Sequence, residues 1–563
     1  METQKETKFE QFLQWLQFNR VELRGCEIRY CDSSKGFGLF SASHASDGVL
    51  LVVPLDLAIT PMRVLQDHTL GPECRVMFDE GDVDDRFLMI LYLTVERLRK
   101  NSSWKPYLNM IPSTFRNPLW FTDDEMQELR GTTLYRATEL QKKNLQSIFE
   151  DKVKDLVTRV LVLDGNSESE VTFEDFLWAN SVFWTRALNI PLPRSYVFPE
   201  IQEADGCFSN LALNSEDSCS STSCTDVVDS KDEKSSELLR DDGGANGVIL
   251  NSTHGETLWV EGLVPGIDFC NHDLKAAATW EVDGTGSVTG VPLSMYLLSA
   301  NQDSSRLEKE ITISYGNKGN EELLYLYGFV IEDNPDDYLM VHYPVEALQN
   351  VSFSESKSQL LDAQKAEYRC LLPRSLLDHG FFPECCSGNI SKDKPIIDRV
   401  CNYSWSGERK TPSYKNKLVF PEDFLTSLRT ISMQEDELFK VSSLLAELVE
   451  CEEERQPSDV EVRAAVWEAC GDSGALQLLV DLLNKKMMDL EAGSGTEDSD
   501  SELLENANVI DVPAGNGRVE TTGSNEHKLM GKNSYARVKK TAELCVQATE
   551  TIRLDRVARS RWP

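Results

Sequence analysis

Residues 257–273 read TLWVEGLVPGIDFCNHD, an apolar stretch that ends in a polar group of Asp268, Asn271 and His272. Neighbouring Asn and His side chains after an apolar segment can orient polar groups against a bound ligand. Asp268 and His272 also suggest a metal site, but the sequence offers no further ligands at a suitable spacing. The alternative is an Asn-His pair with a structural role only. The segment indicates a functional site only if other motifs of the chain lie close to it in the folded protein.

Two tyrosine-glycine pairs follow this segment. Residues 313–316 read ISYG, and residues 320–329 read NEELLYLYGF. A Tyr before a Gly at a strand end presents its phenol at a turn, which makes Tyr315 a candidate active-site group. Tyr327 and Phe329 come after one short predicted helix and could line the same cavity. The alternative is that these aromatic residues belong to the core.

A glycine-rich turn between two predicted strands is the third motif. It consists of Lys35, Gly36, Phe37, Gly38 and Leu39. Glycine lets the backbone approach a ligand closely, and its amides can meet a carboxylate or an amine. No helix follows this turn, which disfavours a dinucleotide-binding fingerprint. An ordinary hairpin turn is the alternative.

The fourth motif is Arg186, at the end of an aromatic helix predicted over residues 172–188. An Arg at this position can hold a carboxylate through its planar guanidinium. The alternative is an arginine that only stabilises the helix C-terminus through the helix dipole.

The pattern around these motifs mixes strands and helices, which predicts an α+β fold. Alternation and turn signals predict strands within 27–60 and at 279–282, 294–298 and 310–315. Helical spacing of apolar residues predicts helices at 8–19, over most of 62–160 with a buried helix at 86–100, at 172–188, at 321–327, as a series between 420 and 492, and at 534–561. Thr122 is the expected N-cap of a helix that begins with three acidic residues.

The 563 residues carry a formal net charge of −36. This charge argues against a basic surface for nucleic acid or for an anionic membrane, and it leaves basic proteins as partners. Residues 200–257 contain 13 acidic against 3 basic residues, and residues 493–530 are also acidic. We expect both segments to be disordered, because their composition does not supply a core.

The sequence also indicates a cellular compartment. The chain has no apolar run of the roughly 18 residues that a membrane-spanning helix needs. Its N-terminus, METQKETKFEQ, resembles neither a secretory signal nor a transit peptide. The fourteen cysteines show no repeated CxxC spacing, so we expect reduced thiols and no zinc site. We therefore expect a location in the cytoplasm or nucleus, with a chloroplast location less favoured. We also expect a monomer.

In this order, the four motifs resemble the SET-domain protein methyltransferases, in the branch typified by the plant Rubisco large-subunit lysine methyltransferase. The resemblance covers about residues 8–340 and includes the Trp-Lys-Pro-Tyr segment at 104–107. It implies an N-terminal helix over 1–26, a SET domain of small curved sheets and a pseudoknot over 27–340 with a helical insert at about 62–172, and a mostly helical substrate-binding-like domain over 341–563.

The resemblance also implies roles for the candidate residues. Those from Lys35 to Leu39 would hold the amino-acid end of S-adenosylmethionine. Asn271 and His272, in the pseudoknot, would bind the same cofactor. Tyr315 would be the catalytic phenol, and Tyr327 with Phe329 would complete the cofactor pocket.

Three residues would lie near the acceptor. Arg186 would contact the carboxylate of the cofactor or line the site, and Asp268 would lie close to both ligands. Trp280 would also be near the acceptor, but it stands where the family often has Tyr. No metal is implied.

These roles predict an S-adenosylmethionine-dependent protein N-methyltransferase that modifies the lysine ε-amine of a non-histone protein. Leu188, two residues after Arg186, is apolar and favours lysine over histidine. A histidine-directed methyltransferase is one alternative. A catalytically silent SET-fold binding or scaffold protein is another, although the intact Tyr315 and Asn271-His272 argue against it.

Overall fold

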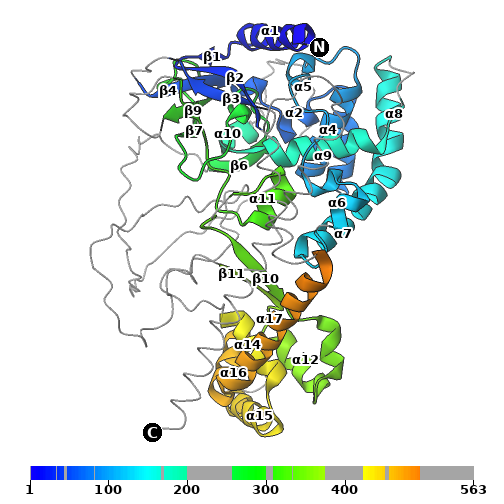
Figure 1. The fold of residues 1–563 in the computed structure, drawn as a ribbon, viewed down its shortest axis with the longest axis vertical. Coiled ribbons are helices and arrows are strands. Elements are labelled where there is room, and N and C mark those ends of the chain that lie inside the picture. The colour runs from blue at the N-terminus through cyan, green and yellow to red at the C-terminus, as the bar shows by residue number, and fades with distance from the viewer. Residues whose placement is uncertain are drawn as a thin grey trace, which may run out of the picture. The chain divides into compact units, whose positions relative to one another are not determined.

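The computed structural model describes residues 2–32, 35–42, 47–81, 83–127, 129–165, 170–198, 257–299, 308–331, 334–373, 422–450 and 455–494 (Figure 1). The chain forms two compact units, one of Met1–Ile190 with Trp259–Pro563 and one of Pro191–Leu258. The predicted helix at 534–561 lies outside the described residues. So do the predicted acidic segments at 200–257 and 493–530, apart from their edges at Thr257 and at 493–494.

Small antiparallel sheets carry the first part of the fold. One has the order β1-β4-β8-β7, and its strands are Glu22–Leu23, Val49–Pro54, Ser294–Ser299 and Ala278–Asp283. Another has the order β2-β3-β9, with strands Cys26–Asp32, Gly36–Ser41 and Glu310–Ile311. Strands β5 (Leu188–Pro193) and β6 (Thr257–Gly262) pair with each other. Each of the first two sheets joins strands within 22–54 to strands within 278–311, so neither forms from a local segment alone.

Strand β9 is shorter than predicted. The sequence predicts a strand over 310–315, but the chain leaves the sheet after Ile311. It then runs beside the Asn-His segment, where His272 and Ile313 form a parallel bridge and the Ile313 amide donates to the Asn271 carbonyl at 3.0 Å. The pairing with a segment some forty residues away therefore replaces the last part of the predicted strand.

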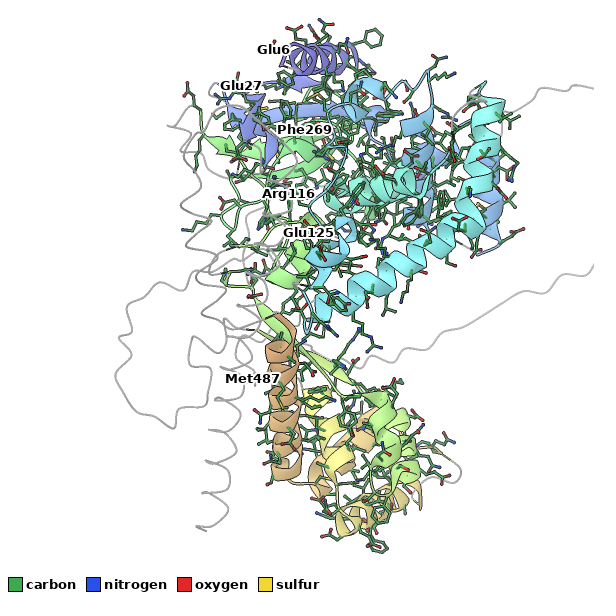
Figure 2. All side chains as sticks on the ribbon, turned by 45° about the vertical axis from the view of Figure 1, so that its right-hand side comes forward. Glu6, Glu27, Arg116, Glu125, Phe269 and Met487 are labelled. Carbon is green, nitrogen blue, oxygen red and sulfur yellow. The ribbon has the colours of Figure 1, made fainter. Side chains whose placement is uncertain are left out.

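The N-terminal helix α1 (Glu2–Phe18) covers an aromatic layer. Its Phe12 is fully buried, and the Phe12 ring centroid lies 5.2 Å from that of Phe269, which Figure 2 labels. The predicted helix at 8–19 is confirmed, although it begins earlier. The wider assignment of residues 1–26 to a helix is too long, because β1 begins at Glu22.

Helices fill the chain between β4 and β5. They are α2 (Pro61–Leu65), α3 (Gly71–Asp79), α4 (Asp85–Leu98), α5 (Lys105–Leu108), α6 (Asp123–Gln127), α7 (Thr133–Ile148), α8 (Lys154–Leu163) and α9 (Phe173–Arg186). Helix α4 is the predicted buried helix, and it packs along α9 (Figure 1). Thr122 caps α6 as expected: its hydroxyl accepts from the Glu125 amide at 3.3 Å. At the start of α9, Thr172 and Asp175 form a capping box.

The C-terminal region is helical, as predicted. It contains α12 (Ser354–Ala363), α14 (Glu422–Ser432), α15 (Glu435–Glu450), α16 (Asp459–Ala469) and α17 (Asp472–Ser494). The sequence did not predict its hairpin of β10 (Tyr338–His342) and β11 (Arg369–Pro373). Leu339 and Val341 of the hairpin share a core with Phe424 and Leu479, and Met487, labelled in Figure 2, packs against it.

The remaining elements are short. They are α10 (Arg194–Val197), α11 (Asn320–Tyr327), a π-helical segment at Phe149–Val153, and 3-10 segments at Leu55–Leu57, Pro118–Trp120, Ile267–Phe269 and Val345–Asn350. None of the helices in the described ranges combines the length and the apolarity needed to cross a lipid bilayer.

Candidate active site

A buried carboxylate organises the turn that carries the Asn-His motif. Asp268 lies in the short turn η4 (Ile267–Phe269), which follows Gly266 at φ +106°. Its side chain has no exposed surface. Oδ1 accepts from the Gly266 amide at 3.0 Å, while Oδ2 accepts from Arg186 Nη1 at 2.9 Å and from the Tyr107 hydroxyl at 2.6 Å. Three donors thus offset part of the loss of solvent around the charge, and burial still raises the pKa of Asp268.

Arg186 and Asp268 form a buried ion pair. Arg186 Nη1 also donates to the Asp268 carbonyl at 3.0 Å, and the guanidinium lies 4.9 Å from the centre of the Phe269 ring. Burial alone would lower the pKa of Arg186, but Asp268 raises it, so the guanidinium stays charged. The carboxylate that Arg186 holds in this structure is therefore a side chain of the same chain.

Two hydrogen bonds fix Tyr315, one from its hydroxyl and one from its backbone amide. Its hydroxyl donates to the Cys270 carbonyl at 2.8 Å, and its backbone amide donates to His272 Nδ1 at 3.1 Å. Burial raises the pKa of Tyr315 well above its usual value. The phenol is therefore a neutral hydrogen-bonding group at physiological pH.

His272 is a neutral imidazole. Burial lowers its pKa to about 4, and because Nδ1 accepts a hydrogen bond, the proton is assigned to Nε2. Asp268 and His272 do not converge as metal ligands, since the carboxylate is held by Arg186 and Tyr107. In the described part of the chain, no group of three His, Cys, Asp or Glu side chains could hold a metal ion.

Helix α11 brings a second phenol to Tyr315. The ring centroids of Tyr327 and Tyr315 are 4.8 Å apart, and Phe329 lies 6.0 Å from Tyr327. Gly328 ends the helix in the left-handed region at φ +79°. A Cβ at Gly328 would lie 2.6 Å from the backbone of Arg116, so only glycine permits this close turn.

Five of the predicted site residues line one cavity of about 330 Å³. They are Arg186, Asp268, Trp280, Tyr315 and Tyr327. Trp259, Leu188 and Asn189 add to its wall, and the Trp280 indole donates to the Asn189 carbonyl at 2.8 Å. A space of this size, with aromatic walls and a few placed polar groups, is suited to a small ligand or a single side chain.

A second cluster gathers beside this cavity around Glu310. Lys35 Nζ lies 2.8 Å from Glu310 Oε2, and Asn271 Nδ2 donates to Glu310 Oε1 at 2.8 Å. A Cβ at Gly38 would lie 3.0 Å from the same amide nitrogen. The glycine turn and the Asn-His pair therefore meet in space, as the resemblance implies.

The other residues of the predicted turn face elsewhere. Gly36 closes the β2–β3 hairpin at φ +74°, and the Phe37 ring stacks on Phe9 with centroids 5.2 Å apart. The Leu39 side chain is fully buried in the core. Any contact of Leu39 with a cofactor would have to use its backbone.

Sequence reasoning missed three functional candidates. Tyr107 belongs to the Trp-Lys-Pro-Tyr match, but nothing in the sequence connected it with Asp268. Glu310 stood at the edge of a predicted strand, and Cys270 contributes a backbone carbonyl. All three act through partners that are distant in sequence or through the main chain, which residue patterns do not reveal.

Two curated proteins that are similar to this chain are methyltransferases. No protein-family model matches the chain. Actin-histidine N-methyltransferase of Canis lupus familiaris is 28% identical over 191 residues, which cover 33% of this chain and 32% of the relative. The enzyme of the same name from Gallus gallus is 28% identical over 187 residues, 32% of this chain and 30% of the relative. The chain thus spans about a third of the length of these curated relatives.

Solved structures match over almost the whole length. The SET domain of LSMT bound to lysine and AdoHcy has a TM-score of 0.56 and 18% identity, and the match covers 97% of this chain and 92% of that one. Rubisco LSMT bound to AdoMet has a TM-score of 0.57 at the same identity and coverage. The chain is therefore a SET-fold protein, built like the Rubisco LSMT structures and with a helical region after its SET domain.

Proposed function

We propose that this protein is an S-adenosylmethionine-dependent protein N-methyltransferase. The observation that carries the proposal is the convergence of Tyr315, Tyr327 and the Arg186–Asp268 pair on one small cavity, beside the Asn271-His272 segment. The methyltransferase names of the relatives and the AdoMet bound in a similar solved structure support the same chemistry.

The residues present suit the cofactor. The backbone around Gly38 leaves no room for a side chain, since a Cβ there would lie 2.7 Å from Cys31 Sγ. Main-chain groups of Lys35 to Gly38, together with Asn271 and His272, would hold the amino-acid end of the cofactor. S-adenosylmethionine, when bound, supplies a methyl group on a positively charged sulfur.

The chain's own residues would prepare the acceptor. A lysine with a pKa of about 10.4 is mostly protonated in water and must lose its proton before it can attack. Leu188, Ala278 and Ile313 give the cavity an apolar wall that disfavours the ammonium form. The neutral phenol of Tyr315 and the backbone carbonyls near it would align the amine, so that positioning provides much of the rate.

Lysine is our first choice of acceptor, on a non-histone protein. Leu188 is buried and lines the cavity, and its apolar side chain suits the aliphatic stem of lysine. Histidine is the second candidate, because the curated relatives are named as histidine methyltransferases and the Trp259 and Trp280 indoles could stack on an imidazole. We propose a cytoplasmic or nuclear location, as the sequence predicts.

Two measurements on the full chain test the proposal. Calorimetry should detect S-adenosylmethionine binding, and tritiated methyl groups should pass to proteins of a cell extract. Mass spectrometry of the labelled protein then distinguishes lysine from histidine. Absence of binding would contradict the proposal, whereas binding without transfer would favour the silent scaffold alternative.

A further inference from the structure

Tyr107 lies behind the cavity rather than in its wall. It belongs to α5 and is fully buried, and it is absent from the residues that line the cavity. Its hydroxyl donates to Asp268 Oδ2 at 2.6 Å, a contact between residues 161 positions apart in the chain. A buried phenol donating to a carboxylate makes a strong, charge-assisted hydrogen bond.

We infer that Tyr107 is a positioning residue for methyl transfer, which fixes the Asp268 carboxylate and through it the wall and the phenol of the site. The inference rests on the function proposed above for the same cavity. Helix α5 would thus influence the reacting groups only through the contact of Tyr107 with Asp268.

Tyr107 is linked to Arg186 through the Asp268 carboxylate, which binds both side chains. Asp268 Oδ2 accepts from both Tyr107 and Arg186, so the tyrosine hydroxyl defines where the carboxylate can receive the guanidinium. Arg186 also lies against the Phe269 ring and lines the cavity. A carboxylate that rotated would therefore move this wall.

Tyr107 is also linked to Tyr315, through Asp268 and the turn that carries it. Arg186 Nη1 holds the Asp268 carbonyl as well as its carboxylate, which fixes the η4 turn. Cys270 follows this turn directly, and its carbonyl receives the Tyr315 hydroxyl at 2.8 Å. The orientation of the catalytic phenol thus depends on the turn that Asp268 anchors.

Helix α1 holds the Tyr107 ring independently of its hydroxyl. The Trp15 ring lies parallel to it with centroids 6.3 Å apart, and the Phe12 ring lies 6.4 Å away. Phenylalanine at position 107 would keep these ring contacts. The variant Tyr107→Phe therefore removes the hydrogen bond and leaves the packing.

The charged and titratable groups facing Asp268 predict a pH effect. They are Arg186 from α9, Tyr107 from α5, and Cys270 and Tyr315 on the cavity side. The Tyr107 hydrogen bond opposes the rise that burial causes in the pKa of Asp268. Its loss would raise that pKa further, so protonation of Asp268 would reach into a higher pH range.

The test compares Tyr107→Phe with a matched control, Tyr92→Phe. Tyr92 on α4 is also buried, and its hydroxyl accepts from the Trp104 indole at 2.9 Å, with no contact to Asp268. Both variants lose one buried phenol hydroxyl, so both should lower the thermal midpoint, and Tyr107→Phe should lower it more because its hydroxyl donates to a carboxylate.

Turnover should separate the two variants. With tritiated S-adenosylmethionine and extract protein as the acceptor pool, Tyr107→Phe should lower kcat about tenfold and change the KM for S-adenosylmethionine little. The acid limb of its pH profile should move to higher pH. Tyr92→Phe should keep the wild-type kcat and pH profile.

Two results would overturn the inference while the proposed function stands. One is wild-type turnover and an unchanged pH profile in Tyr107→Phe. The other is an equal loss of kcat in both variants, which would make the effect structural. A wild-type protein that neither binds S-adenosylmethionine nor transfers methyl groups would refute the proposed function, and the inference with it.

Discussion

The Asn271 amide is the residue-scale link between the glycine turn and the cavity. It donates to Glu310, which also pairs with Lys35, and its neighbour His272 holds the Tyr315 amide. The sequence predicted Asn271, His272 and Tyr315 at one site, and the structure brings the three residues together. The sequence did not reveal Glu310, because the Lys35–Glu310 pair joins residues 275 positions apart.

Replacing Asn271 by alanine should nearly abolish methyl transfer. The change removes a half-buried amide that reaches both Glu310 and the Phe37 carbonyl, while the backbone pairing with Ile313 remains. We expect a loss of turnover of at least about a hundredfold with little change in the thermal midpoint. Initial rates of label transfer and thermal unfolding measure the two effects, and retained turnover would count against this site.

His272 should make folding stability depend on pH. Its pKa falls from about 6.5 in the unfolded chain to about 4 in the folded protein. As pH falls from 6.5 towards 4, the unfolded chain takes up a proton that the folded protein does not, so stability falls over this window.

The variant His272→Gln isolates this effect, because glutamine keeps an acceptor without titrating near neutral pH. Urea unfolding at pH 7 and pH 5 should give a smaller difference in unfolding free energy for the variant than for the wild type. Equal differences would mean that His272 is protonated to the same extent in both states.

At the scale of elements, local signals predicted most helices and failed where distant partners decide the structure. Helices α4, α9 and α14 follow from apolar spacing, and Asp84 and Thr172 cap the first two. Strand β9 ends early because residues after Ile311 pair with the Asn-His segment. The β10–β11 hairpin escaped prediction because its two short strands are joined by α12 and not by a tight turn.

The β2–β3 hairpin offers an element-scale prediction. A Cβ at position 38 would lie 2.7 Å from Cys31 Sγ and 3.0 Å from Asn271 Nδ2, so Gly38→Ala should displace both side chains. We expect S-adenosylmethionine to bind about tenfold more weakly, as calorimetry can measure. Gly471→Ala is the control, since its Cβ would meet nothing within 4 Å. Equal affinities of the two variants would contradict the role of this turn.

At the scale of the whole molecule, the net charge of −36 would attract a basic acceptor protein. Salt screens such an attraction, with a Debye length of about 8 Å at physiological ionic strength. We expect the KM for a basic acceptor protein to rise about threefold between 50 and 200 mM NaCl, at an unchanged kcat. Steady-state rates at several salt concentrations measure this, and a KM independent of salt would argue for an uncharged interface.

The overall architecture was predictable through the family resemblance that four short motifs carry in their order, although each motif alone had a structural alternative. Spacing could not predict the side-chain network behind the site, because Tyr107, Arg186 and Asp268 come from separate elements. Their geometry emerges only when the insert and the SET sheets fold together.

A crystal structure of the full chain with S-adenosylhomocysteine would show directly whether the cofactor binds between the glycine turn and the cavity beside Tyr315. We predict that the amino-acid end of the ligand lies against the backbone of Gly38 and Asn271, with its sulfur directed at the cavity beside Tyr315. Clear electron density for the ligand at another place, with the cavity beside Tyr315 empty, would contradict this prediction.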